Sequence, residues 1–323
     1  MAYRILKFSC AEDDADALES MLDDIPVVHA WVRRVDRDTA HAELLVDARD
    51  AETAVDRLIE RLAPIKCFHV ASLPVEAVMP RPRPVRVRGR RERLGRQELY
   101  ADVLQAAQPS FAFFAFVVLS SIVAAIGLLR GDTAVIIGAM VIAPLLGSNL
   151  GLALGTTLGD VPLVVRSAGS GLAGGAVALA LALAAGAIWG ADPTAPAIAA
   201  RTHVGYEDVA LALASGAACA LSVTTGMSSA LIGVMVAVAL LPPTVTLGML
   251  AGAGHLAAAA RAAHLVAINL ICVNLAGVVT FLAQGIRPFG WWDAARARRA
   301  TAIAIAAWTT LLAALVALLA RAA

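Results

Sequence analysis

The residues whose types and spacing could bind a small polar solute lie beside prolines inside two long apolar stretches. In the first stretch, Pro144 precedes Ser148 and Asn149. In the second, the pair Pro242–Pro243 precedes Thr244. A proline has no amide hydrogen for the carbonyl four residues earlier, so a break there leaves free carbonyls near these polar side chains. Such groups can bind a cation or a neutral polar solute, whereas a half-helix N-terminus can bind an anion.

The two proline-containing stretches resemble one another. Thr133–Asp160 and Ser228–Leu250 align without a gap. Six positions match, in which Ile137, Gly138, Met140, Val141, Leu145 and Leu146 correspond to Ile232, Gly233, Met235, Val236, Leu240 and Leu241. Chance matches are frequent in a chain so rich in Ala, Leu, Val and Gly, and the Gly and Met matches favour a true internal repeat over chance. We predict that both stretches are interrupted helices.

The candidate set for substrate or ion binding follows from these breaks. It consists of Gly138, Met140, Pro144, Ser148, Asn149, Thr224, Thr225, Gly233, Met235, Pro242, Pro243 and Thr244. Further polar residues at membrane depth are Thr156, Thr157, Ser222, Ser228, Ser229, Thr246, Asn269 and Asn274. For each of these residues the alternative role is interhelical hydrogen bonding.

Charged residues are missing from the depth of every predicted membrane span, which disfavours a proton-driven pump. The sequence shows no nucleophile–base pair, phosphate-binding loop or metal-ligand cluster. We therefore expect no enzyme activity, no cofactor and no metal. Glycines spaced by four, among them Gly248 and Gly252, indicate close helix packing, as do Gly171 and Gly175 and the run Gly151, Gly155 and Gly159.

Composition divides the chain into three parts. Hydrophobic residues make up 59% of the 323 residues, and the mean hydropathy is +0.76. Residues 1–79 contain 16 Asp or Glu against 9 Lys or Arg, whereas residues 81–96 contain eight Arg and one Glu. No charged residue occurs from Val209 to Gly254. We predict a cytoplasmic head (1–79), an Arg-rich linker with an interfacial helix (80–109) and a transmembrane domain (110–323).

The head is predicted to be a small α+β domain of the ferredoxin-like type, with the order βαββαβ. Alternating apolar residues predict four strands, and helical periodicity predicts two helices. The predicted strands are Tyr3–Cys10, Val27–Val35, Ala40–Ala48 and Ile65–Leu73, and the predicted helices are Ala11–Asp24 and Asp50–Pro64.

The Arg-rich linker lies close to the first apolar span, and no aromatic residues alternate with its arginines. A membrane surface is therefore its expected anionic partner, with Arg81–Arg96 binding anionic lipid headgroups, and nucleic acid is not. The segment Arg96–Gln108 is predicted to form an amphipathic helix with Leu99, Val103 and Leu104 on one face.

Seven apolar segments are long enough to be candidate spans of a lipid bilayer. They are Ser110–Leu129, Thr133–Leu158, Val161–Trp189, Val209–Thr224, Ser228–Leu250, Leu265–Gln284 and Ala300–Ala320. The fourth is short and is open to a re-entrant interpretation. The Arg bias places the head in the cytoplasm. With this count the repeated stretches run in opposite directions, as in a 3+3 inverted repeat with Pro-broken helices.

The repeated runs also resemble a membrane-protein family catalogued as domain of unknown function 389. Its hallmarks are a Gly-Ala-Met run leading to a proline, matched by Gly138, Ala139, Met140 and Pro144, and a Leu-Pro-Pro run, matched by Leu241, Pro242 and Pro243. The resemblance covers most of Ser110–Gln284. In that family a proline commonly follows the small residue after the first break, where this chain has Ser148 and Asn149. The resemblance implies the membrane architecture, and it implies no substrate or catalytic residue.

We expect a transporter or permease of a small solute or ion in the inner (cytoplasmic) membrane, with the head as a regulatory or assembly module. A homo-oligomer is expected. One alternative is a homo-oligomeric channel in which Ser, Thr and Asn line a pore. The other is a ligand-sensing, membrane-anchored scaffold that transports nothing.

Overall fold

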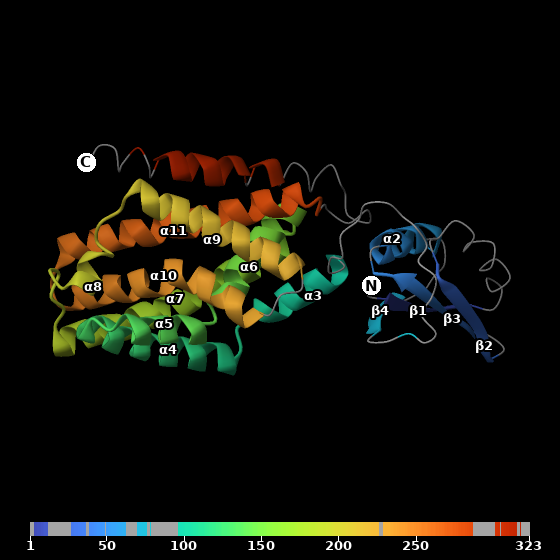
Figure 1. The fold of residues 1–323 in the computed structure, drawn as a ribbon, viewed down its shortest axis with the longest axis horizontal. Helices are drawn as coiled ribbons and strands as arrows, with labels where there is room; N and C mark the ends of the chain where they lie inside the picture. The colour runs from blue at the N-terminus through green and yellow to red at the C-terminus, as the bar shows by residue number, and fades with distance from the viewer. Residues whose placement is uncertain are drawn as a thin grey trace. The chain divides into compact units, whose positions relative to one another are not determined.

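The computed structural model describes residues 3–11, 27–36, 39–48, 50–62, 70–75, 78, 96–225, 229–286, 301–303, 305–314 and 317. The chain divides into two compact units, Met1–Glu98 and Leu99–Ala323 (Figure 1).

The first unit contains a four-stranded antiparallel sheet. Its strands are β1 (Tyr3–Ala11), β2 (His29–Asp36), β3 (Thr39–Asp47) and β4 (Val70–Val75), in the order β2-β3-β1-β4. Alternation along β1 buries Leu6 and Phe8. These side chains form one apolar cluster with Leu58 of α2 (Ala51–Leu62). One face of the sheet is thus covered by a helix.

The strands and the second helix of the head lie close to their predicted positions. β4 is described only from Val70, because residues 63–69 lie outside the described part of the chain. The first predicted helix, Ala11–Asp24, falls almost wholly on residues 12–26, which also lie outside it. The strand order is that of a split βαβ arrangement, and the complete ferredoxin-like fold stays a prediction.

The second unit is helical. Its helices are α3 (Arg96–Ala106), α4 (Phe111–Arg130), α5 (Thr133–Ile142), α6 (Leu145–Leu158), α7 (Val161–Trp189), α8 (Pro196–Ala199), α9 (Tyr206–Thr224), α10 (Ser229–Gly252) and α11 (Leu256–Ala283). Among the described residues, α4, α7, α9 and α11 are each long and apolar enough to cross a bilayer. The pair α5–α6 also qualifies when it is counted as one bent span. The chain is a multi-pass helical membrane protein.

Short polar and glycine signals set the ends of these helices. Asp132 and Asp160 accept hydrogen bonds from the first-turn amides of α5 and α7. Gly131 (φ 66°) and Gly159 (φ 68°) end α4 and α6 in the left-handed region, where glycine carries no steric penalty. Gly159 therefore shapes the turn between α6 and α7, and its predicted role in helix packing stays a prediction.

Two span boundaries differ from the predicted ones. α9 begins at Tyr206 and has 19 residues, which removes the reason for considering it too short to cross. α11 begins at Leu256, nine residues before the predicted start, and so includes Arg261 and His264. The seventh predicted span, Ala300–Ala320, is described only in part.

Two helix pairs run side by side in the same direction. Gly248 of α10 lies against Ala182 of α7, and Gly252 lies against Leu183. Likewise Asn149 and Ala153 of α6 lie against Asn274 and Gly277 of α11. Because the tight turn at Gly159 reverses the chain between α6 and α7, α6 and α10 are antiparallel.

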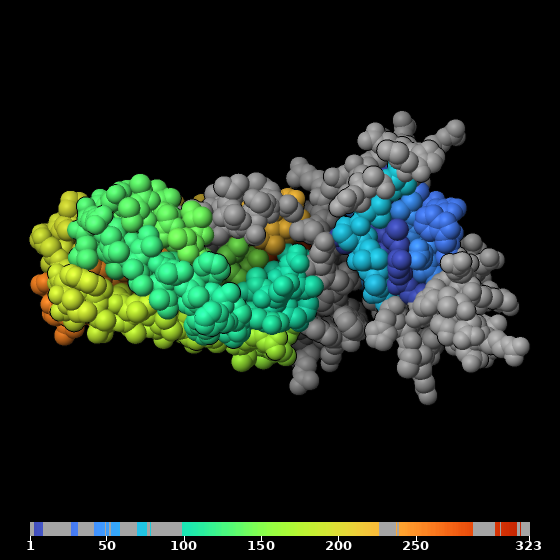
Figure 2. Space-filling model, turned by 90° about the horizontal axis from the view of Figure 1, so that it is seen from below, coloured from blue at the N-terminus to red at the C-terminus, as the bar shows by residue number. Residues whose placement is uncertain are grey.

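The helix α10 is central in the second unit. It packs against α4, α5, α6, α7, α9 and α11. The face of this unit shown in Figure 2 is formed largely by the green and yellow-green segments of α4 and α7. The helix α3 joins the same core, since Leu99 and Val103 are buried in a cluster with Leu154 and Leu158.

Candidate functional site

The first repeated stretch is interrupted, as predicted. α5 ends at Ile142, Ala143 is extended (φ −65°, ψ 125°), and α6 starts after Pro144. The two helix axes differ by 56°. Pro144 has no amide hydrogen to donate to the carbonyl of Met140. A break at this point therefore removes no hydrogen bond between these two residues. The break therefore follows directly from the proline.

The predicted interruption of the second stretch is wrong. α10 runs continuously from Ser229 to Gly252 with Pro242 and Pro243 inside it. These prolines remove the helical donors for the carbonyls of Val238 and Ala239. The side chain of Asn269 on α11 replaces one of them, because its Nδ2 donates to the carbonyl oxygen of Ala239 at 2.7 Å. A tertiary hydrogen bond thus compensates for part of the proline pair.

The two repeated stretches contact each other around their prolines. Met140 and Ala143, next to the first break, belong to one apolar cluster with Leu241 and Val245 of α10. In the gap-free alignment, Ala143–Pro144 corresponds to Val238–Ala239. The bend of the first stretch therefore corresponds to the point in α10 where the carbonyls lack helical donors.

Three buried asparagines make polar contacts of α11 with α6 and with α10. Asn274 is fully buried, and its Nδ2 donates to the carbonyl of Leu270 at 2.8 Å and to Oδ1 of Asn149 at 3.2 Å. Asn149 is 6% exposed and donates to the carbonyl of Leu145 at 2.9 Å. Asn269, described above, is also 6% exposed. This asparagine cluster, Asn149, Asn269 and Asn274, links α6 and α10 to α11.

Two oxygens of the asparagine cluster have no hydrogen-bond donor among the described residues. They are Oδ1 of Asn269 and Oδ1 of Asn274. The amide orientations are fixed, because each Nδ2 faces a carbonyl oxygen that only a donor can approach. Oγ1 of Thr246, fully buried in α10, also has no partner. Unpaired buried polar atoms are rare and unfavourable, and here two of the three are acceptors only.

The hydroxyl groups among the predicted site residues bond within their own helices. Ser148 is buried and donates to the carbonyl of Leu145, and Thr244 donates to the carbonyl of Leu240. Thr224 and Thr225 bond to carbonyls of their own helix at the end of α9. Intrahelical bonds account for the hydroxyl groups of all four.

The glycine and methionine candidates lie outside the asparagine cluster. Gly138 and Met140 are on α5, where Met140 is buried in the apolar core and an added Cβ at Gly138 would meet nothing within 4 Å. Gly233 and Met235 belong to α10, and their surroundings lie outside what the structure describes.

Sequence reasoning placed Asn269 and Asn274 at membrane depth but did not assign them to the site. The available signal was that asparagine is unfavourable in lipid, so two on one span favour a shared polar environment. Within the residues that the structure describes, no three His, Cys, Asp or Glu side chains are grouped as a metal site requires.

Tyr100 and Asp160 form a polar contact that sequence reasoning missed. The phenol of Tyr100 on α3 donates to Oδ2 of Asp160 at 2.6 Å. Asp160 is 4% exposed and also accepts from the amide of Leu163 in the first turn of α7. Burial and the hydrogen bond to Asp160 raise the pKa of Tyr100 to about 12. The pattern Asp160-Val161-Pro162, a helix N-cap with proline in the first turn, was the available signal.

Comparison with known proteins places the chain in a family. The model described as "Domain of unknown function (DUF389)" matches residues 140–275. The chain is 35% identical over 269 residues to an uncharacterized protein of Methanocaldococcus jannaschii, and the match covers 83% of this chain and 84% of that protein. No solved structure matches. The matched residues include the bent stretch from Met140, the proline pair of α10 and the asparagine cluster. The chain belongs to the family of domain of unknown function 389.

Proposed function

We propose that this protein transports a small solute or ion across the inner membrane, with its head in the cytoplasm. The observation that carries the proposal is the asparagine cluster. Its buried, uncharged amides, two of them with unpaired acceptor oxygens, lie between α11 and the two repeated stretches. Buried polar groups at membrane depth that are not fully paired are typical of a path for a polar solute.

The helix contacts support an inverted repeat of α4–α7 with α9–α11. When the two trios are exchanged, with α5–α6 corresponding to α10, several helix contacts of one trio correspond to contacts of the other. α4 packs on α7 as α9 packs on α11, and α6 packs on α7 as α10 packs on α11. The contact of α6 with α11 corresponds to that of α10 with α7. The antiparallel directions of α6 and α10 agree with this exchange.

The difference between the two stretches suggests how the site changes its exposure. One stretch is bent at Ala143–Pro144, whereas the other is a continuous helix through the equivalent Val238–Ala239. In an inverted-repeat carrier, exchange of the two repeat conformations opens a central site to the opposite side. We propose that α10 bends at Ala239 when α5–α6 straightens, and that Asn269 releases the Ala239 carbonyl in that step.

The acceptor oxygens favour a substrate that brings positive charge or hydrogen-bond donors. Oδ1 of Asn269 and Oδ1 of Asn274 can accept but not donate. Among the described residues, the hydrogen-bond partners of the asparagine cluster are backbone carbonyls and the cluster's own amides, and none of them is charged. A monovalent cation or a neutral, donor-bearing solute therefore fits better than an anion.

Flux into liposomes tests the proposal. We would reconstitute the full-length protein and measure uptake and counterflow of rubidium, sodium and a panel of neutral amides and polyols. Saturable uptake with counterflow is expected, and single-channel conductance steps would indicate a channel instead. Absence of flux for every cation and neutral probe, with uptake of anions alone, would contradict the assigned substrate class and site.

Variants of the prolines provide the matched comparison. Pro144→Ala and Pro242→Ala should each lower uptake by about tenfold or more, because exchanging proline for alanine favours a straight helix by up to about 3 kcal/mol. Gly171→Ala is the control, since its Cβ would lie at an ordinary 3.4 Å from Ser148. Equal losses of folded protein in all three variants would assign the prolines a packing role only.

A further inference from the structure

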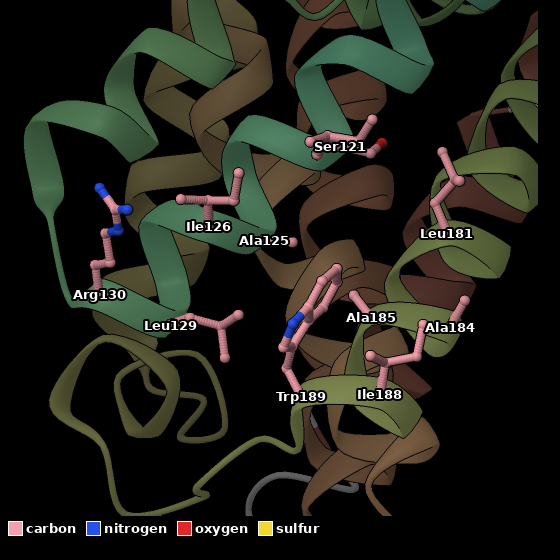
Figure 3. Close-up of a pocket in the computed structure, with 11 residues that line it drawn as sticks. Ser121, Ala125, Ile126, Leu129, Arg130, Leu181, Ala184, Ala185, Ile188 and Trp189 are labelled. Carbon is pink, nitrogen blue, oxygen red and sulfur yellow. The ribbon is translucent and has the colours of Figure 1, made fainter.

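An apolar groove lies between α4 and α7, away from the asparagine cluster. It has a volume of about 540 Å³. Ser121, Ile126 and Arg130 of α4 and Leu181, Ala184 and Trp189 of α7 are among its lining residues (Figure 3). Apart from Ser121 and Arg130 its lining is apolar or aromatic, and Ile126 and Trp189 are 42% and 69% exposed. The groove therefore opens on the outer surface of the membrane unit.

The length of the groove matches one leaflet of a bilayer. From Ser121 to Arg130, α4 rises by about 14 Å at about 1.5 Å per residue. This distance is about half of a hydrocarbon core of about 30 Å. Ser121 and Leu181 lie at one end of the groove, and Leu129 and Trp189 lie at the other (Figure 3). The groove is therefore about as long as a single acyl chain in one leaflet.

One end of the groove carries the residues of a membrane interface. Arg130 is exposed and, among the described residues, makes no hydrogen bond or ion pair. The nearby carboxylate of Asp132 is engaged by the amides of Ala134 and Val135. Trp189 lies at the same end, and tryptophan and arginine both favour the headgroup level. A guanidinium next to an apolar groove is complementary in charge to a phosphate group that is attached to a hydrocarbon chain.

We propose that this groove binds one acyl chain of an anionic glycerophospholipid, whose headgroup phosphate pairs with Arg130. The depth of the groove, the unpaired guanidinium and Trp189 together favour a lipid over a second copy of the chain. This site is independent of the proposed transport site, since none of its lining residues belongs to α6, α10 or α11.

Native mass spectrometry of the full-length protein tests the proposal. Protein purified in detergent would be titrated with phosphatidylglycerol or phosphatidylcholine, and the retained lipid adducts counted. We expect one adduct that prefers phosphatidylglycerol. Arg130→Gln should weaken this adduct about tenfold, the value of a charge-assisted hydrogen bond to phosphate. Ala184→Phe should abolish it by filling the groove.

Two controls separate the groove from general lipid contact. Arg166→Gln changes another exposed arginine, near the start of α7, and Ala173→Phe changes an exposed alanine on α7 outside the groove. Both should retain the adduct. The proposal would be overturned if phosphatidylglycerol and phosphatidylcholine bound equally well and Arg130→Gln left that binding unchanged. Displacement of the adduct by glycerol phosphate alone, or a dimer mass that Ala184→Phe converts to monomer, would overturn it as well.

Discussion

The side-chain amide of Asn269 donates a 2.7 Å hydrogen bond to the carbonyl of Ala239, the carbonyl that Pro243 leaves without a helical donor. Asn269→Leu should therefore destabilise the protein by about 1–3 kcal/mol, because the buried carbonyl is left unpaired. Pro243→Ala supplies an amide to the same carbonyl and should rescue most of this loss. Thermal unfolding in one detergent measures both effects.

The neighbouring proline provides the control for this pair. Pro242→Ala supplies an amide to the carbonyl of Val238, which Asn269 does not contact, so it should add independently to Asn269→Leu. If both prolines rescue Asn269→Leu equally, the specific link between Asn269 and Ala239 is wrong.

The backbone contact between α7 and α10 predicts that alanine substitutions at two glycines of α7 differ in their effect on stability. A Cβ at Gly186 would lie 2.0 Å from the carbonyl oxygen of Met249, whereas a Cβ at Gly175 would meet nothing within 4 Å. Gly186→Ala should destabilise by about 1–3 kcal/mol through overpacking. Gly175→Ala should be neutral or stabilise by up to about 1 kcal/mol through helix propensity. Similar melting temperatures for the two variants would rule out this contact.

The contact of Tyr100 with Asp160 predicts a loss of stability in alkali. The pKa of Tyr100 is raised from 10.0 to about 12, so the folded protein keeps a proton that the unfolded chain releases. Stability from this group is complete below pH 10.0 and is lost as the pH rises toward about 12. Ultraviolet titration of tyrosinate should show a late step that is missing in Tyr100→Phe. In Asp160→Asn the step should move to lower pH, and an unmoved step would refute the contact.

Opposite directions of the repeated stretches predict opposite labelling of their first residues. In a cysteine-free background, Ala134→Cys and Ser229→Cys should react with a membrane-impermeant maleimide from opposite sides of the membrane. His255→Cys, after α10, should react from the side of Ala134, and Asp102→Cys on α3 from the side of Ser229. Labelling of Ala134→Cys and Ser229→Cys from one side would identify α5–α6 as a re-entrant loop.

Local sequence patterns predicted most helices and strands, but they did not predict that α10 is continuous through its proline pair. Alternation in β1 and apolar length in α4 and α7 are properties of neighbouring residues, so these elements were predicted within a few positions. In α10 one carbonyl left without a helical donor is bound by Asn269, which lies on the next helix and contacts Ala239 only after folding. A proline pair read by itself therefore predicted a break.

The start of α11 was missed for a related reason. The predicted span began at Leu265, just after Arg261 and His264, yet the helix begins at Leu256 and includes both. Arg261 is exposed, and a long charged side chain near a helix end reaches the interface without ending the helix. The candidate site was predicted only in its general location, because the mutual hydrogen bond of Asn149 and Asn274 joins residues 125 positions apart.

The Tyr100–Asp160 hydrogen bond also connects α3 to the helix pair that contains the bent span. The head is joined covalently to the rest of the protein only through the segment that ends in α3. Tyr100 fastens α3 to the turn between α6 and α7, and Gly147, three residues after Pro144, lies directly against the backbone of Ala106 at the end of α3. A displacement of α3 would therefore reach α6, the half of the bent span that carries Asn149, through direct protein contacts.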